Sequence, residues 1–236
     1  MMNDKATFEE HIDKVCAQVN QKAGWILRTF HCRKTWFMQL MWKQLIQGHI
    51  DYCSQLYQPL QSGSLQRLEN LQKVYTKKIP EVRMLNYWER LKHLKIISQQ
   101  RRLERYRIIY TWKVLEGLAP NCGINTRGDI SDRMGRKCVM PTLKGRQKVK
   151  TLREQSFQSH GPRLFNALPK HIRNIYRCGV EESKEKLDQF LSTIPDHSKI
   201  GGLVPATCNL MTGQPSNSLV NQIREHLRGQ GTRIKA

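Results

Sequence analysis

The stretch SQQRRLERYRIIYTWKVLEGL, residues 98–118, carries a long helical pattern that decides the fold class of this chain. Its apolar side chains recur at spacings of three and four residues, which is the period of one helix face. That stripe consists of Leu103, Tyr106, Tyr110 and Val114. Gly117 and Pro120 end the pattern, because glycine favours helix C-termini and proline cannot continue a helix. We expect the stripe to face a core and the other side chains to face solvent.

The residues before this stretch repeat the helical pattern several times. Apolar periodicity predicts helices over residues 8–30, 35–57, 64–79 and 86–94, with a bend at Gly48 and an end at Pro80. Together with the long helix, they make about five helices that each bury one stripe. The sequence therefore predicts a mainly α chain whose residues 1–120 form a helical bundle.

The residues after the long helix have a different composition. Residues 121–150 are rich in glycine and in basic side chains, and Cys138–Leu143 and Gln155–Ser159 are short strand candidates. A compact turn and short helix are expected near residues 161–168, and a further helix over Ser183–Leu191. We expect residues 121–195 to form a basic loop and a small α+β closing region. Residues 196–236 are expected to be a loose, flexible tail, with one or two helical turns over Val220–Leu227.

Charge is the strongest global signal in the sequence. The chain has 40 Lys and Arg against 19 Asp and Glu, for a formal net charge of +21, so an anionic partner is expected. Nucleic acid is the commonest such partner, and a membrane surface is the alternative. No apolar run is long enough to span a bilayer, and acidic residues interrupt the N-terminal segment where a signal peptide would need an apolar core. The seven cysteines show no Cys-x-x-Cys pairing, which favours reduced thiols in a nuclear or cytoplasmic protein that is not secreted.

Several blocks, in this order, resemble one protein family. They are FEEHI (8–12), AGWILRTF (23–30), IDYCSQLYQP (50–59), NYWERLKHL (86–94), QRRLERY (100–106), YTWKVLEG (110–117), GPRLFNALP (161–169) and LDQFL (187–191). They are similar to the region beyond the palm in reverse transcriptases of jockey-like non-LTR retrotransposons, although Tyr57 stands where the family usually has Trp. The resemblance covers roughly residues 5–225, and it depends on the order of the blocks because no single block is a chemical motif.

The resemblance implies a thumb-like helical bundle followed by a tail. In this family the thumb follows the template–primer hybrid by its shape. The family's palm holds an adjacent pair of aspartates and a third aspartate, which bind two metal ions. No Asp-Asp pair occurs here, and the nearest approach to one is Asp129 and Asp132 within a basic loop. We therefore expect a truncated fragment related to an RNA-directed DNA polymerase, without fingers, palm or endonuclease and without polymerase activity of its own.

Three groups of cations are the candidate nucleic-acid-binding residues, because guanidinium and ammonium groups bind phosphate oxygens. They are Arg101, Arg102, Arg105 and Lys113 on the long helix, Lys73 and Lys77 on the 64–79 helix, and Arg136, Lys137, Lys144, Arg146 and Lys148 in the central loop. An alternative reading is a solvated helix face whose arginine stems cover apolar surface. For Lys77, stabilisation by the helix C-terminus is an equally good explanation.

Other chemistry has little support in the sequence. The five tryptophans lie in apolar helical stripes, so core packing is expected for most of them. His49 and Cys53 have a helical spacing, but no second pair completes the four ligands of a zinc site. Neither a nucleophile–base arrangement nor a phosphate-binding glycine loop is present, and no cofactor is expected.

The sequence leaves more than one functional hypothesis open. The first is sequence-independent binding to a duplex or an RNA–DNA hybrid, with an affinity that falls steeply with salt. The second is a helical protein-interaction module, for which the palm and fingers portion of a polymerase is one possible partner. A non-functional remnant of a retroelement is the third, and an enzyme in its own right is the least favoured.

Overall fold

The fold is mainly α and divides into two compact units. In a computed structural model of the chain, unit 1 consists of Met1–Leu103 with Asp196–Ala206, and unit 2 of Glu104–Pro195 with Thr207–Ala236. The residues that the structure describes are 8–55, 62–121, 123–126, 136–142, 145–146, 153–154, 156–196, 208–209, 214–215 and 219–233. The division falls within the long helix, whereas the sequence suggested boundaries at residues 120 and 195.

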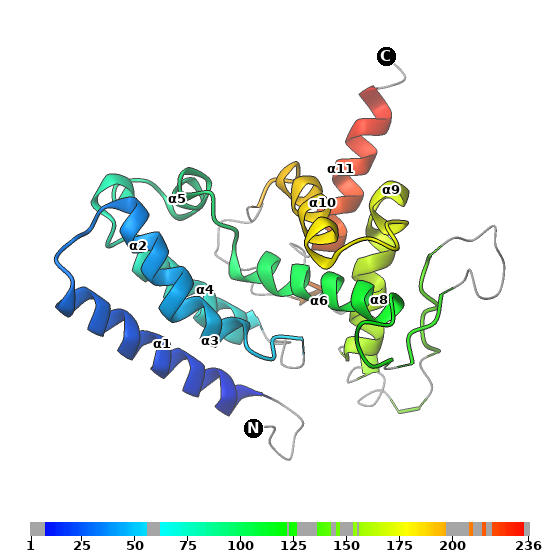
Figure 1. The fold of residues 1–236 in the computed structure, drawn as a ribbon, viewed down its shortest axis with the longest axis horizontal. Coiled ribbons are helices and arrows are strands. Elements are labelled where there is room, and N and C mark those ends of the chain that lie inside the picture. The colour runs from blue at the N-terminus through cyan, green and yellow to red at the C-terminus, as the bar shows by residue number, and fades with distance from the viewer. Residues whose placement is uncertain are drawn as a thin grey trace. The chain divides into compact units, whose positions relative to one another are not determined.

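Unit 1 is built around the helix α1 (Glu9–Thr29), which runs beside the rod formed by residues 35–51 in Figure 1. The helix buries the stripe Ile12, Val15, Val19 and Ile26, as its period predicts. It ends before Arg33, whose guanidinium Nη2 donates to the Leu27 carbonyl at 2.5 Å and whose Nη1 donates to the Phe30 carbonyl. A cation at the last carbonyls satisfies acceptors that no helical N–H can reach.

The second helical rod is α2 (Thr35–Met41), the π-helical turn η1 (Trp42–Ile46) and α3 (Gln47–Asp51) in direct succession. Gly48 was expected to bend this helix, but it lies within α3, and the irregular turn comes before it. The buried Trp42 indole donates to Gln47 Oε1 at 2.7 Å across this turn. Met38, Ile46 and Ile50 bury the rod in the core of unit 1.

Unit 1 also contains the two helices predicted over residues 64–79 and 86–94, and a short turn between them that was not predicted. They are α4 (Ser62–Thr76), the 3-10 turn η2 (Pro80–Val82) and α5 (Tyr87–Leu94). At the start of α5, Asn86 accepts from the Glu89 backbone N–H, and the Glu89 carboxylate accepts from the Asn86 N–H. This reciprocal capping box satisfies two N–H groups that a helix start leaves unpaired.

The long helix α6 spans Gln99–Leu115, so it begins in unit 1 and ends in unit 2. Its burial corrects the expectation of a single apolar stripe. Tyr106 and Tyr110 of the expected stripe are only partly buried, while Ile108, Thr111 and Trp112 are buried. Side chains are buried on several sides of α6, so its burial does not follow a single amphipathic stripe.

Unit 2 packs α8 (Phe157–Ala167), α9 (Lys170–Arg173), α10 (Val180–Ser192) and α11 (Leu219–Arg233) around a second core with the C-terminal part of α6. Asn166 of α8 holds the preceding segment in place, because its amide exchanges two hydrogen bonds with the Cys138 backbone, at 2.8 and 2.9 Å. The buried residues Leu219, Val220 and Ile223 attach α11 to this core. The tail is therefore helical over residues 219–233 and packed at the start of this helix, and is not loose there.

The small α+β character expected for residues 121–195 is not found in the described part of that region. Cys138 forms one isolated bridge with Thr126, and the strand expected over Gln155–Ser159 is wrong because α8 already begins at Phe157. The only described strands are the antiparallel pair β1 (Cys208–Asn209) and β2 (Gln214–Pro215). Within the described residues, no helix combines the length and the apolar character needed to cross a bilayer.

Candidate nucleic-acid interface

Two carboxylates fix the start of α6 within unit 1. Asp196 accepts from the Ser98 backbone N–H at 2.6 Å and from the Ser98 hydroxyl at 2.8 Å. The buried carboxylate of Glu69 on α4 accepts from the Gln99 backbone N–H at 3.0 Å and also from the Tyr87 hydroxyl. Negative charge is favourable at a helix N-terminus, so this arrangement anchors α6 to α4 and α5.

Burial controls the protonation of this anchor. Desolvation raises the pKa of Glu69 to about 7, although the hydrogen bonds from Tyr87 and the two backbone amides of α6 act in the opposite direction. The pKa of Tyr87 is raised well above its ordinary value, chiefly by burial and further by the Glu69 carboxylate. Glu69 therefore exchanges a proton near neutral pH in the interior of unit 1.

The arginines of α6 that the sequence assigned to phosphate binding are engaged with carboxylates. Arg101 is only 3% exposed and lies 3.5 Å from Asp196. Arg102 binds Asp51 with a two-pronged contact, Nε to Oδ1 at 3.0 Å and Nη2 to Oδ2 at 2.8 Å. In this geometry two adjacent N–H donors of the guanidinium already bind a carboxylate, and the same donor pair is the one that would bind a phosphate.

The same arrangement recurs in unit 2. Arg105 binds both oxygens of Asp188, with Nη2 to Oδ2 at 2.6 Å. Arg136 is 2.5 Å from Glu116 and also donates to the Ile175 carbonyl. Arg101, Arg102 and Arg105 of α6 therefore have carboxylate partners inside the fold, and so does Arg136 of the central loop.

The lysines among the predicted site residues are placed differently. Lys73, Lys77 and Lys137 are exposed, as is Arg146, whereas Lys113 is half-buried. Lys144 and Lys148 lie outside the described residues. The structure therefore brings Lys73 and Lys77 together at the end of α4 in unit 1, whereas Lys137 and Arg146 belong to unit 2.

The end of α4 begins a segment that is rich in exposed cations. Residues 73–95, here called the basic segment, contain seven Lys and Arg, and their acidic residues are Glu81 and Glu89. Glu81 accepts from the Thr35 hydroxyl and Glu89 is used in the capping box. Apart from the buried Arg90, the cations are exposed and no ion pair involves them within the described residues. They are Lys73, Lys77, Lys78, Arg83, Lys92 and Lys95.

A row of four aromatic rings that the sequence did not predict lies at the bend between α1 and α2; Figure 1 shows the backbone of this bend, between the two blue helices. Trp25 lies edge-on to Phe30 at 5.7 Å between ring centroids, Phe30 to Phe37 at 5.3 Å, and Phe37 to Trp36 at 5.7 Å. Edge-to-face pairs of this kind each contribute about 0.5–1.5 kcal/mol beyond area burial, so contacts between neighbouring rings stabilise the positions of all four rings.

The two ends of this aromatic row are open to solvent. Trp25 is 48% exposed and Trp36 62% exposed, which corrects the expectation of core packing for these two. Trp42 and Trp112 are buried as expected. The helical period does not show that two indoles are exposed at one bend. The sequence does mark the region as free of acidic residues, since no Asp or Glu occurs between Asp13 and Asp51.

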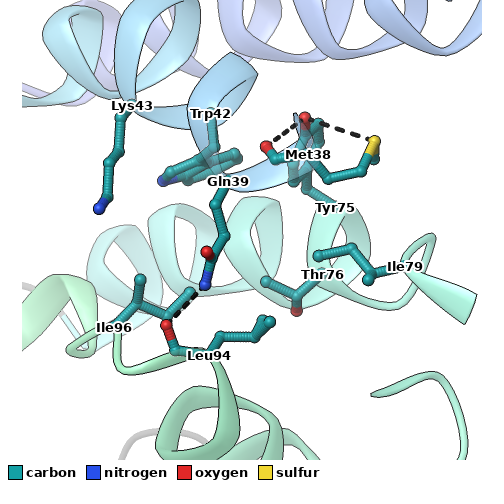
Figure 2. A pocket seen from close by; sticks show the side chains of 9 residues that line it. All are labelled: Met38, Gln39, Trp42, Lys43, Tyr75, Thr76, Ile79, Leu94 and Ile96. Carbon is teal, nitrogen blue, oxygen red and sulfur yellow. Dashed lines mark hydrogen bonds between the residues drawn. The ribbon is translucent and has the colours of Figure 1, made fainter. Parts of the chain in front are cut away.

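A small pocket in unit 1 is lined by residues of α2, η1 and α4, by the end of α5 and by the segments that follow α4 and α5. Figure 2 shows Gln39 reaching across it to donate to the Leu94 carbonyl, at 2.6 Å, and the Tyr75 hydroxyl donating to the Met38 carbonyl at 3.0 Å. Burial raises the pKa of Tyr75 to about 12, so this phenol stays neutral. Lys43 is the one lining residue with a charge, and the pocket offers no acid–base pair.

One further side chain, that of His160, bears on acid–base chemistry. Burial, with the charges of Arg107 and Arg163, lowers the pKa of His160 in unit 2 to about 3, which keeps this imidazole neutral. Among the residues that the structure describes, no three His, Cys, Asp or Glu side chains gather closely enough to hold a metal ion.

Comparisons of the chain with family models, with curated proteins and with solved structures found no match.

Proposed function

We propose that this chain binds nucleic acid through its phosphate backbone, without reading the base sequence, in the manner of a reverse transcriptase thumb. The support is the net charge of +21, the mainly helical fold and the ordered blocks that resemble jockey-like non-LTR reverse transcriptases. The proposal assigns nuclear or cytoplasmic nucleic acid as the partner, since an unbalanced positive charge repels itself until a polyanion neutralises it.

The observation that carries this proposal is the basic segment of unit 1. Its six exposed cations have no carboxylate partner within the described residues, in contrast to the paired arginines of α6. Lysine side chains in solvent are suited to phosphates at variable positions, because each ammonium group acts as a mobile point charge. Contacts of this type position a nucleic acid but carry no sequence information.

The proposal includes no polymerase activity for this chain alone. Its seven aspartates include no adjacent pair, and two-metal phosphoryl transfer needs clustered carboxylates. A primer-extension assay with purified protein, primed template and Mg²⁺ is expected to give no incorporation. Nucleotide incorporation would replace the binding function by an enzymatic one.

The direct test is the salt dependence of binding to labelled duplex DNA and to an RNA–DNA hybrid of equal length. The apparent affinity is expected to fall linearly on a log–log plot, with a slope of about −0.9 for each phosphate that is neutralised. Two unrelated sequences of one length are expected to bind equally. An affinity that is indifferent to salt, or strong preference for one sequence, contradicts the proposal.

A protein partner is the second candidate, and it is favoured by apolar side chains within the basic segment. Val74 is 59% exposed and Met84 93% exposed. Large exposed apolar groups often mark interaction surfaces. Light scattering separates the two readings, because a monodisperse monomer that binds duplex favours nucleic acid, whereas self-association that survives high salt favours protein docking.

A further inference from the structure

The aromatic row in unit 1, formed by Trp25, Phe30, Phe37 and Trp36, is the feature that the proposed function leaves unexplained. Its end rings are 48% and 62% exposed, although burying an indole is strongly favourable. The bend is held firmly, since Arg33 binds the carbonyls of Leu27 and Phe30. The exposed rings are therefore presented by ordered backbone at the junction of two helices.

Cations alternate with these rings along the chain. Arg28 and Lys34 are exposed and lie between Trp25 and Trp36 in sequence. The stretch from Lys14 to Ile50 contains six Lys and Arg and no acidic residue. The carboxylate of Glu81 accepts from Thr35 and so brings the basic segment next to the start of α2.

We propose that the aromatic row is a base-stacking site for single-stranded nucleic acid, with Trp25 and Trp36 as the stacking rings. Unpaired bases stack on exposed aromatic side chains whatever their sequence, while neighbouring cations follow the phosphates. A paired duplex hides its base faces, so this site would select unpaired nucleotides. The inference rests on the proposed function and adds the class of ligand to it.

Charge favours this occupant over a protein. An apolar protein surface would also cover Trp36 and Leu40, which is 41% exposed and one helical turn further along α2. A protein partner would gain nothing from the acid-free stretch and its exposed cations unless it were itself strongly acidic. A single strand supplies both ring faces and a regular array of negative charges.

The test uses the full chain and two fluorescent 20-nucleotide probes, a mixed-sequence DNA strand and a strand of the same length built from abasic tetrahydrofuran units. Both carry the same phosphates, so a difference in affinity measures the bases. We expect the natural strand to bind about tenfold more tightly or better. The double variant Trp25→Ala/Trp36→Ala should lose this difference while binding duplex DNA within about twofold of the parent.

Matched controls come from exposed aromatic residues outside the row. Tyr52→Ala, at a side chain that is 71% exposed, and Tyr176→Ala, at one that is 60% exposed, are expected to leave the natural-to-abasic ratio unchanged. Circular dichroism checks that the double variant is folded. If it is not, ultraviolet crosslinking of the parent protein to the natural strand decides, and adducts are expected on the peptides that contain Trp25 and Trp36.

The outcomes separate the two proposals. Equal affinity of the parent protein for natural and abasic strands, with duplex binding retained, overturns the stacking site and leaves phosphate binding standing. Absence of binding to every nucleic acid overturns both. A double variant that keeps the natural-to-abasic difference but changes the oligomeric state overturns the stacking site and assigns the aromatic row to protein docking.

Discussion

The start of α6 and the bend between α1 and α2 carry similar cations in opposite surroundings. Asp51, Glu69 and Asp196 surround the first turns of α6 and hold its backbone and its arginines. The bend has no acidic residue of its own and presents two indoles among exposed cations. The comparison teaches that the number of cations in a segment does not locate a binding surface, because only the acids nearby decide which cations stay available.

The largest expected effect comes from removing the carboxylate that anchors α6. Glu69→Ala leaves the Tyr87 hydroxyl and the Gln99 backbone N–H without their acceptor in the interior. The expected loss is about 3–5 kcal/mol in the free energy of unfolding, measured by urea denaturation. Asn70→Ala on the exposed side of the same helix is the control and should change stability by less than about 0.5 kcal/mol. A loss below about 1 kcal/mol for Glu69→Ala would show that the anchor is unimportant.

The second expected effect is on pH dependence. Because burial raises the pKa of Glu69 from 4.5 to about 7, the folded protein holds a proton that the unfolded chain releases between these values. The contribution of this group to stability is complete below pH 4.5 and is lost as the pH rises through about 7. Its size is on the order of 3 kcal/mol.

The measurement is the difference in unfolding free energy between the parent protein and Glu69→Gln from about pH 4 to about pH 8. This range includes the pKa of Glu69 in both the unfolded and the folded state. Relative to the variant, which cannot titrate here, the parent should become less stable as the pH rises. A parallel pair of curves, or a parent that gains stability with pH, would refute the buried titration.

The third prediction distinguishes paired from unpaired arginines. Arg102→Ala leaves the Asp51 carboxylate, 18% exposed, without its two-pronged partner, so stability should fall by about 1–3 kcal/mol. Affinity for duplex DNA should stay within about twofold of the parent at a temperature where the variant is folded. A large loss of affinity with unchanged stability would return α6 to the binding surface.

The smallest effect on stability is expected at the exposed cations. Replacing Lys73, Lys77 and Lys78 together by Gln should change the free energy of unfolding by less than about 0.5 kcal/mol per site. The same variant should reduce the salt slope of duplex binding by about one for each phosphate contact that is lost. Lys14→Gln on α1, which removes one positive charge outside the basic segment, is the control for the charge lost at each single site.

Much of the helical architecture is predictable from local pattern. The buried stripe of α1, the end of α4 before Pro80 and the start of α5 at Asn86 each depend on residues within a few positions of one another. The strand expected at Gln155–Ser159 was wrong because five residues are too few to separate alternation from a helix start, and α8 continues through Pro162.

The site could not be predicted in the same way. The carboxylates that bind Arg102 and Arg105 lie 51 and 83 residues away in sequence, and Asp196 lies 98 residues from Ser98. No periodicity contains these separations, so the arginines of α6 looked available. Apolar spacing also places Trp25 and Trp36 on helix faces. It does not show that both side chains stay about half exposed, near the end of α1 and the start of α2.

The central claim is that nucleic acid contacts the bend and the basic segment and not the arginines of α6. Mass-spectrometric footprinting with lysine- and arginine-specific reagents, with and without saturating single-stranded DNA, tests it most directly. We expect protection of Arg28, Lys34, Lys77 and Lys78, which are exposed, and little modification of Arg101 and Arg102 in either state. Unchanged labelling at the bend and the basic segment, with protection confined to other cations, would contradict the claim.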